Sequence, residues 1–219
     1  MSEQMASKGI TSEKIQEALN FVYDKTVNGV VGIDSAAQIA ASYRFDDDDV
    51  LSAADTLIRW QIAKAASSGF LTGLGGVLTL PVAIPANLFT VIFVQIRMIA
   101  ALAHMGGHDI KDDRVRALVF SCLVASSTVD VAKDIGIAFT GKLATTAVRQ
   151  ISGQTIKRIN QAVGFRLLTK FGEKGVINMG KAIPLLGGVL GGAIDGVTTN
   201  IIGNLARDTF IGKSSELKS

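Results

Sequence analysis

The sequence predicts an all-α protein, a compact helical bundle built around a long apolar helical hairpin and a glycine-rich C-terminal helix. Apolar residues recur at helical spacing in the polar parts of the chain, as Ile15, Leu19 and Val22 show. Only three prolines occur in 219 residues, and aromatic residues make up 6% of the chain. Aliphatic residues therefore carry most of an apolar fraction of 48%, which is enough for one sizeable core.

We expect a single domain over residues 1–219, because this length suits one core. Charge divides the chain unevenly: residues 1–66 contain six Lys/Arg and ten Asp/Glu, whereas residues 109–175 contain eleven and six. An acidic front and a basic middle favour either mutual packing or an anionic partner. The four expected parts are acidic amphipathic helices (1–66), an apolar hairpin (67–108), basic helices (109–175) and a glycine-rich helix (176–213).

Three helices are expected in the acidic part. The first covers Thr11 to Asn20, where a Thr-Ser-Glu start offers an N-cap with an acid in the first turn. The second covers Ser35 to Tyr43 and the third Val50 to Ala66. The four consecutive carboxylates at 46–49 lack the spaced ligands and central glycine of a calcium loop. We interpret them as acids placed before a helix N-terminus, where the helix dipole favours them.

The segment from Ala65 to Ile96 is 32 residues long and has no formal charge. A membrane-spanning helix needs about 20 apolar residues, so the length is sufficient. Glycines and prolines nevertheless interrupt it, because proline removes a helical N–H and clashes with the preceding turn. The interrupting residues, which we predict to contact a membrane or a partner, are Gly73, Gly75, Gly76, Pro81 and Pro85.

We therefore predict a helical hairpin here, with arms at about Ser67–Leu80 and Pro85–His104 joined by a Pro-x-x-x-Pro turn. Two interpretations remain open. The hairpin forms the buried core of a soluble protein, or it associates with or inserts into a membrane. The first arm is too short to span a bilayer comfortably, so a re-entrant or interfacial hairpin is favoured over two full spans.

A further helical stretch is expected from Asp112 to Phe139, followed by a basic amphipathic helix from Lys142 to Lys170. A basic amphipathic helix can lie on an anionic bilayer. Nucleic acid is excluded as a partner, because the aromatic residues do not interleave with the basic ones and no recognition motif occurs. The residues predicted to contact an anionic surface are Lys142, Arg149, Lys157 and Arg158.

The last helix, from Ile183 to Ala206, carries glycines at every fourth position, namely Gly188, Gly192 and Gly196. Glycine costs about 1 kcal/mol relative to alanine inside a helix, so close packing must compensate. Such a stripe allows another helix to approach, either in a membrane or in a soluble core. Asp195 lies within this apolar segment and needs a partner if it is buried, for which Arg97 is the candidate.

No catalytic, cofactor or metal site is predicted. The sequence Gly136-x-x-x-x-Gly141-Lys142 resembles a phosphate-binding loop, but Leu143 stands where Ser or Thr should bind magnesium. His104 and His108 are four residues apart, yet two glycines between them are expected to end the helix. The polar N-terminus has no signal segment after it, and a lone cysteine permits no internal disulfide, so we expect a cytoplasmic protein.

Four stretches over about residues 55–212 together resemble a known family. They are Gly69–Gly76 with Leu80-Pro81 and Ile84-Pro85; Gln95–Ile99 with Ala103, Gly107 and Asp109; Asp113-Arg114-Val115; and Ile183-Pro184, the glycines at 187–192, Asp195, Asn200–Gly203, Ala206 and Phe210. This pattern is similar to that of the bacterial EcsC family, named after a gene beside an ABC-transporter pair linked to protein secretion and processing. The resemblance implies a helical fold and a role at or near the membrane, and it supplies no catalytic residues.

Three functions follow as hypotheses. The first is a non-enzymatic, membrane-associated protein, peripheral or embedded at the inner membrane and accessory to transport or secretion, whose partner is an anionic membrane surface or a membrane protein. The alternative is a soluble protein-interaction module with the hairpin as its core. The third and weakest is a pore-forming or membrane-inserting protein. A homo-oligomer is compatible with each, and none requires a cofactor.

Overall fold

A computed structural model of the protein describes residues 11–43, 49–65, 86–136, 142–171 and 189–212. These residues form helices joined by turns, with one isolated β-bridge between Val30 and Ile33 and no strand within the described ranges. The predicted all-α class is therefore confirmed. The helices are α1 (Ser12–Asn28), α2 (Ala36–Ser42), α3 (Val50–Ala65), α5 (Ala86–Met105), α6 (Asp113–Val124), α7 (Thr128–Ile135), α8 (Thr145–Val148), α9 (Gly153–Phe171) and α11 (Val189–Phe210).

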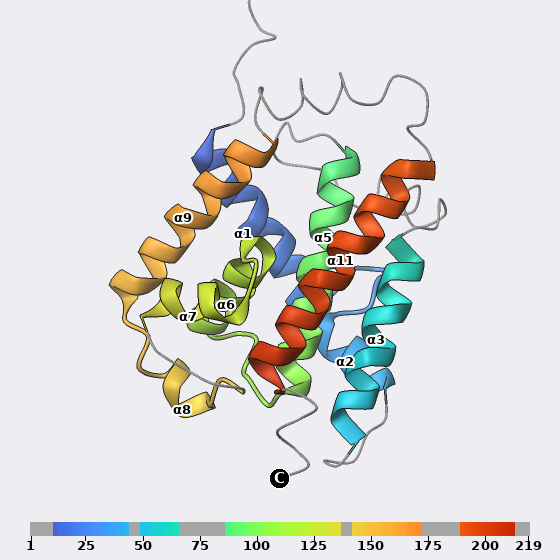
Figure 1. Ribbon diagram of the computed structural model, residues 1–219, viewed down its shortest axis with the longest axis horizontal. Helices are drawn as coiled ribbons and strands as arrows, with labels where there is room; N and C mark the ends of the chain where they lie inside the picture. The colour runs from blue at the N-terminus through green and yellow to red at the C-terminus, as the bar shows by residue number, and fades with distance from the viewer. Residues whose placement is uncertain (1–10, 44–48, 66–85, 137–141, 172–188, 213–219) are drawn as a thin grey trace, which may run out of the picture.

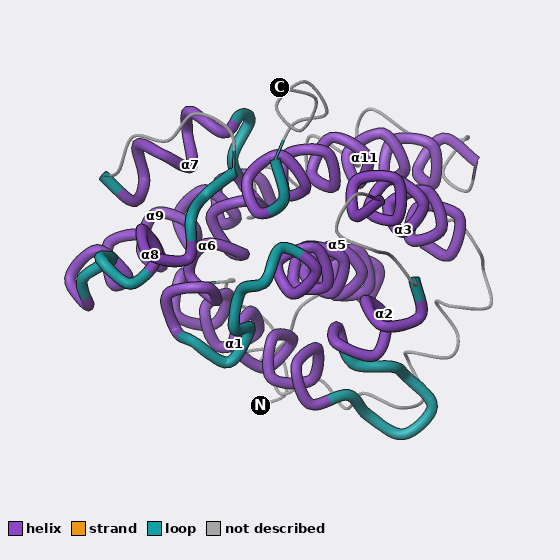
Figure 2. Tube along the Cα trace, turned by 90° about the horizontal axis from the view of Figure 1, so that it is seen from below, coloured by secondary structure: helices purple, strands orange, loops and turns teal. Residues whose placement is uncertain are grey.

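Helix α5 is the centre of the bundle. It contacts α1, α2, α3, α6 and α11, and Figure 2 shows it enclosed by them. A helix that is apolar on every side is buried on every side, and α5 follows this rule. Phe93, Ile96, Ile99 and Leu102 are fully buried although they point in different directions around the helix. The second arm of the predicted hairpin is therefore a core helix, and the first arm lies outside the described residues.

Local signals in the sequence fix several helix ends. Ser35 forms a capping box at the start of α2, because its side chain accepts from the Gln38 N–H while the Gln38 side chain accepts from the Ser35 N–H. Helix α5 ends in a Schellman motif, in which the His108 N–H donates to the Ala103 carbonyl at 3.0 Å. Gly107 occupies the left-handed position there with φ of 83°. The predicted helix end at the glycine pair is confirmed.

Four predicted helices differ from those in the structure. The last one, predicted to end at Ala206, continues as α11 to Phe210, and its predicted start lies outside the described residues. Helix α1 continues to Asn28 instead of ending near Asn20, because Val22, Tyr23 and Thr26 extend its buried face. The predicted helix over 112–139 is two helices, because Ser127 caps a new helix, α7, by accepting from the Asp130 N–H. The predicted continuous helix over 142–170 is likewise wrong. It is split into α8 and α9 where Ser152 accepts from the Thr155 N–H.

The helices lie on two sides of α5. In Figure 1, α2, α3 and α11 are on one side, and α1, α6, α7 and α9 are on the other. Asp134 ties three elements of the second side together, because it pairs with Arg166 of α9 at 3.0 Å and accepts from the Ser121 hydroxyl of α6 at 2.7 Å. None of the helices in the described ranges is long and apolar enough to cross a membrane.

Candidate functional site

The predicted glycine and proline contacts are only partly visible. Gly73, Gly75, Gly76, Pro81, Pro85 and Gly188 lie outside the described residues. Gly192 lies in the first turns of α11. Gly196 faces Ile62 of α3, and a Cβ built on it would sit 3.6 Å from the Ile62 methyl, an ordinary van der Waals distance. Helix α11 therefore packs on α3 at Gly196, but the contact leaves room for the methyl group of an alanine.

The tighter contacts occur at three glycines that were not predicted as contact residues, Gly106, Gly164 and Gly203. A Cβ on Gly164 would come within 2.7 Å of the Ser12 hydroxyl oxygen. A Cβ on Gly203 would come within 2.9 Å of Ile58 and 3.1 Å of Met98, where α11 crosses α3 and α5. A Cβ on Gly106 would come within 2.3 Å of the Phe210 carbonyl oxygen. Gly203 lies seven residues after Gly196, hence on the same helix face, and extending the stripe by two turns would have found it. Gly106 had no such signal, because its contact depends on the distant end of α11.

A group of buried polar residues crosses the interface of α3, α5 and α11. Arg97 is 4% exposed and donates to the Gln61 side-chain oxygen at 3.4 Å. Beside it, the Gln95 amide donates to the Thr199 hydroxyl at 3.2 Å. Burial lowers the pKa of Arg97 to about 10, against a smaller opposing effect of Asp34. The predicted ion pair of Arg97 with Asp195 stays a prediction, because the Asp195 side chain lies outside the described residues.

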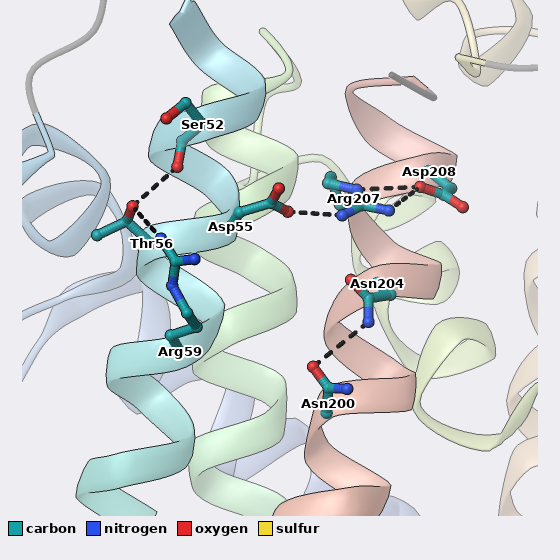
Figure 3. Close-up of polar contacts among 8 residues, drawn as sticks. All are labelled: Ser52, Asp55, Thr56, Arg59, Asn200, Asn204, Arg207 and Asp208. Atoms are coloured by element: carbon teal, nitrogen blue, oxygen red, sulfur yellow. Dashed lines mark hydrogen bonds and ion pairs between the residues drawn. The ribbon is translucent and has the colours of Figure 1, made fainter. Parts of the chain in front are cut away.

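Arg207 joins α11 to α3 at the opposite end of their interface. Its guanidinium lies 2.5 Å from a carboxylate oxygen of Asp55 and 2.7 Å from one of Asp208 (Figure 3). Burial lowers the pKa of Arg207, but hydrogen bonds and the charges of both carboxylates outweigh that effect and raise the pKa. Because Asp55 is nearly half exposed, water screens the pair and its contribution to stability is modest. We interpret this cluster as a set of polar contacts that stabilises the packing of α11 on α3.

The two histidines lie in different surroundings. His104 is exposed, whereas His108 is 3% exposed and packs edge-on against the Phe210 ring, with ring centroids 5.3 Å apart. No group of three or more potential metal ligands occurs in the part of the chain that the structure describes. Burial lowers the pKa of His108, as does the charge of Lys142, although the Phe210 and Leu143 carbonyls act in the opposite direction.

This shift predicts a pH dependence of stability. Because the pKa of His108 is lower in the folded protein than its ordinary value of 6.5, the unfolded chain binds the proton first as pH falls. The contribution of neutral His108 to the free energy of unfolding is therefore complete above pH 6.5 and is lost as the pH falls below 6.5. We expect the denaturant concentration at the unfolding midpoint to fall as the pH is lowered through 6.5, and His108→Gln to make it fall less. His104→Gln is the matched control, and an equal reduction of this fall by both variants would contradict the assignment.

The single cysteine of the chain, Cys122, lies in the core. Cys122 is fully buried, and burial raises the pKa of its thiol to about 12, which keeps it protonated and unreactive.

An open pocket of about 180 Å³ lies between α1 and the start of α6. Its charges are mixed and partly paired, as Arg116 and Asp113 are 2.7 Å apart. Its residues are Tyr23, Asp24, Val27, Asn28, Ile110, Lys111, Asp113 and Arg116.

The predicted anionic-surface residues are all exposed, but they do not lie on one helix. Lys142 precedes α8, Arg149 ends it, and Lys157 and Arg158 lie near the start of α9. The expectation that one amphipathic helix over residues 142–170 carries them is therefore wrong. Helix α8 and the first turns of α9 nevertheless lie on the same side of the bundle, away from α3 (Figures 1 and 2).

Backbone contacts hold this basic region against the bundle. The Leu143 N–H donates to the Thr209 carbonyl at 2.8 Å, which fixes the chain beside Lys142 to the end of α11. The Arg114 side chain donates to the Ile151 carbonyl at 3.1 Å and holds the turn between α8 and α9 on α6. Residues 142–171 contain six Lys/Arg and no Asp/Glu, so the region presents cations on a fixed framework. We define Lys142, Arg149, Lys157 and Arg158 as the basic surface.

Comparison with known proteins agrees with the sequence pattern. The sequence model of the EcsC protein family matches residues 3–211. No curated protein and no solved structure matches the chain. The family match covers nearly the whole chain, including every helix within the described ranges. The chain therefore belongs to the EcsC protein family.

Proposed function

We propose that this protein is a non-enzymatic, membrane-associated helical protein, accessory to transport or secretion, that binds an anionic bilayer through its basic surface. The observation that carries the proposal is the charge of residues 142–171, which contain six cations and no acid. Within the described residues, the structure assigns an ion pair to Arg166, with Asp134, and none to the four residues of the basic surface. Their charge is thus available to an anionic partner.

The electrostatic attraction of these four cations to an anionic bilayer is strong enough for reversible binding. Each cation held near an anionic bilayer contributes about 1 kcal/mol, so four contribute about 4 kcal/mol, or roughly a thousandfold in partitioning at low salt. Salt screens such interactions over about 10 Å at 0.1 M ionic strength, so the binding should weaken as salt is added. In this proposal the protein is a peripheral component at the cytoplasmic face of a membrane.

Neutralising the basic surface tests the proposal. The full chain is sedimented with phosphatidylcholine vesicles that contain or lack phosphatidylglycerol. We expect binding only to the anionic vesicles, and a loss of at least tenfold in affinity when all four cations are replaced by Gln. The control variant replaces four other cations in the same way, which gives the same net charge. Those control residues are Lys14, Lys25, Arg59 and Lys111.

An equal loss of binding in both variants would contradict a localised basic surface. Failure of the unaltered chain to bind anionic vesicles would contradict membrane association by this route. Release of a trapped dye from the vesicles would favour the pore-forming hypothesis instead, and the absence of release would count against it.

The burial of α5 favours a second candidate function, a protein-interaction module whose apolar hairpin is its core. The second hairpin arm contacts five other helices and carries no large exposed apolar side chain in its described part. Such a protein would bind a membrane protein or another partner through its surface. It would be monodisperse without detergent, as measured by light scattering, and a requirement for detergent would exclude it.

A further inference from the structure

Among the residues of α9 whose side chains the structure describes, one aromatic side chain is exposed to solvent. Phe165 is 64% exposed, on the face of α9 opposite the buried Ile159, Val163 and Leu167. Residues seven apart lie on the same helix face, so Arg158 is in line with Phe165. The other exposed residues of this helix are Gly153, Gln154, Lys157, Gln161 and Thr169.

Single exposed apolar side chains are common on proteins and require no explanation by themselves. Phe165 differs in its surroundings, because its helix contains cations and no carboxylate at all. A cationic helix that also exposes an aromatic ring has the two properties that interfacial binding uses, attraction to anionic headgroups and burial of an apolar ring below them. The charge is complementary to a bilayer that contains anionic lipid, and it repels a basic partner.

We propose that the exposed face of α9 lies flat on an anionic bilayer, with Phe165 inserted at the headgroup–acyl boundary and Arg158 on lipid phosphates. Seven residues of helix extend about 10 Å, so both side chains reach one plane when the helix lies parallel to the membrane. This inference rests on the proposed function and adds to it the orientation of the bundle and a residue that enters the apolar layer. Helix α9 keeps its own apolar face in the bundle, so docking requires no unfolding.

The chain offers a built-in control, because Trp60 is its sole tryptophan. Trp60 is 57% exposed, nearly as much as Phe165, and it lies on α3, on the far side of α5 from α9 (Figure 2). A chain with Trp60→Phe and Phe165→Trp therefore carries one fluorophore on the proposed membrane face. The unaltered chain carries one on the opposite side of the bundle.

Fluorescence with brominated lipids tests the insertion directly. We expect anionic vesicles with bromine on the acyl chains to quench the tryptophan of the double variant and to leave Trp60 of the unaltered chain unquenched. If the double variant binds these vesicles without quenching, insertion of α9 is overturned while membrane association stands. If only Trp60 of the unaltered chain is quenched, the bundle binds the membrane through the side that carries α3, and the proposal is overturned. If neither chain sediments with the vesicles, the proposed function fails as well.

Affinity gives a second, independent readout. Phe165→Ser should weaken binding to anionic vesicles about tenfold, with the slope against salt unchanged, because the ring contributes burial and no charge. Trp60→Ser should leave the affinity unchanged. Circular dichroism should show both variants folded, because the two positions are exposed. Equal effects of the two substitutions would overturn the proposal. Binding to an acidic protein in place of anionic lipid would overturn it as well.

Discussion

Replacing Gly106 by alanine is expected to lower the free energy of unfolding by about 2–3 kcal/mol, as overpacking of a rigid site does. The new methyl group would lie 2.3 Å from the carbonyl oxygen and 2.9 Å from the carbonyl carbon of Phe210. Both atoms belong to backbone, so neither can move aside by a side-chain rotation. The last turn of α11 would have to separate from the end of α5. Chemical denaturation followed by circular dichroism measures the loss.

Two other glycines of the bundle serve as matched controls. Gly203→Ala should cost less than Gly106→Ala, because the neighbouring atoms at 2.9–3.1 Å belong to the side chains of Ile58 and Met98 and not to backbone. Gly196→Ala should be neutral or stabilising, because its Cβ has an ordinary contact at 3.6 Å and alanine is the better helix former by about 1 kcal/mol. A cost at Gly196 as large as that at Gly106 would refute this account of the helix contacts.

If Arg97 pairs with Asp195 as predicted, Arg97→Met should lower the free energy of unfolding by about 3–5 kcal/mol, the usual cost of removing one partner of a buried ion pair. Arg97 is 4% exposed, so its removal leaves buried polar groups without their cation. One is the side-chain oxygen of Gln61, and by prediction the other is the carboxylate of Asp195. Methionine has a similar shape, which limits the loss of packing.

A double-mutant cycle decides whether Asp195 is the partner. If the two residues pair, Asp195→Leu should also destabilise the protein, and the double variant should recover much of the sum of the two losses. Buried ion pairs replaced by apolar residues of similar volume are often neutral to stability, which is the basis of this expectation. Losses that simply add would show that Arg97 is satisfied by other groups and that Asp195 is independent of it.

Helix type and several helix ends follow from local chemistry, and these predictions succeed. Ser35 and Gln38 occupy capping-box positions, and the glycine pair at 106–107 ends α5, because these signals act within one or two turns. The breaks inside the predicted helices 112–139 and 142–170 were missed. Ser127 and Ser152 can cap a new helix or lie within a longer one, and tertiary contacts decide between these outcomes.

The candidate site was only partly predictable. The four cations of the basic surface are exposed as expected, since charged side chains seldom lie in a core. Their arrangement on separate elements depends on hydrogen bonds between residues far apart in sequence, such as Leu143 with Thr209. The exposure of Phe165 was not predicted either, because an aromatic residue in an amphipathic helix is usually buried.

By itself, the sequence determined the all-α class, the family and the apolar helix at the centre of the bundle, because composition and periodicity are local properties. Only the tertiary structure decided which glycines permit close approach and which side chains remain in solvent. No sequence signal distinguishes the space beside Gly106 from that beside Gly196, yet one faces backbone at 2.3 Å and the other a methyl group at 3.6 Å. That difference is set by where a second helix passes, which no local pattern encodes.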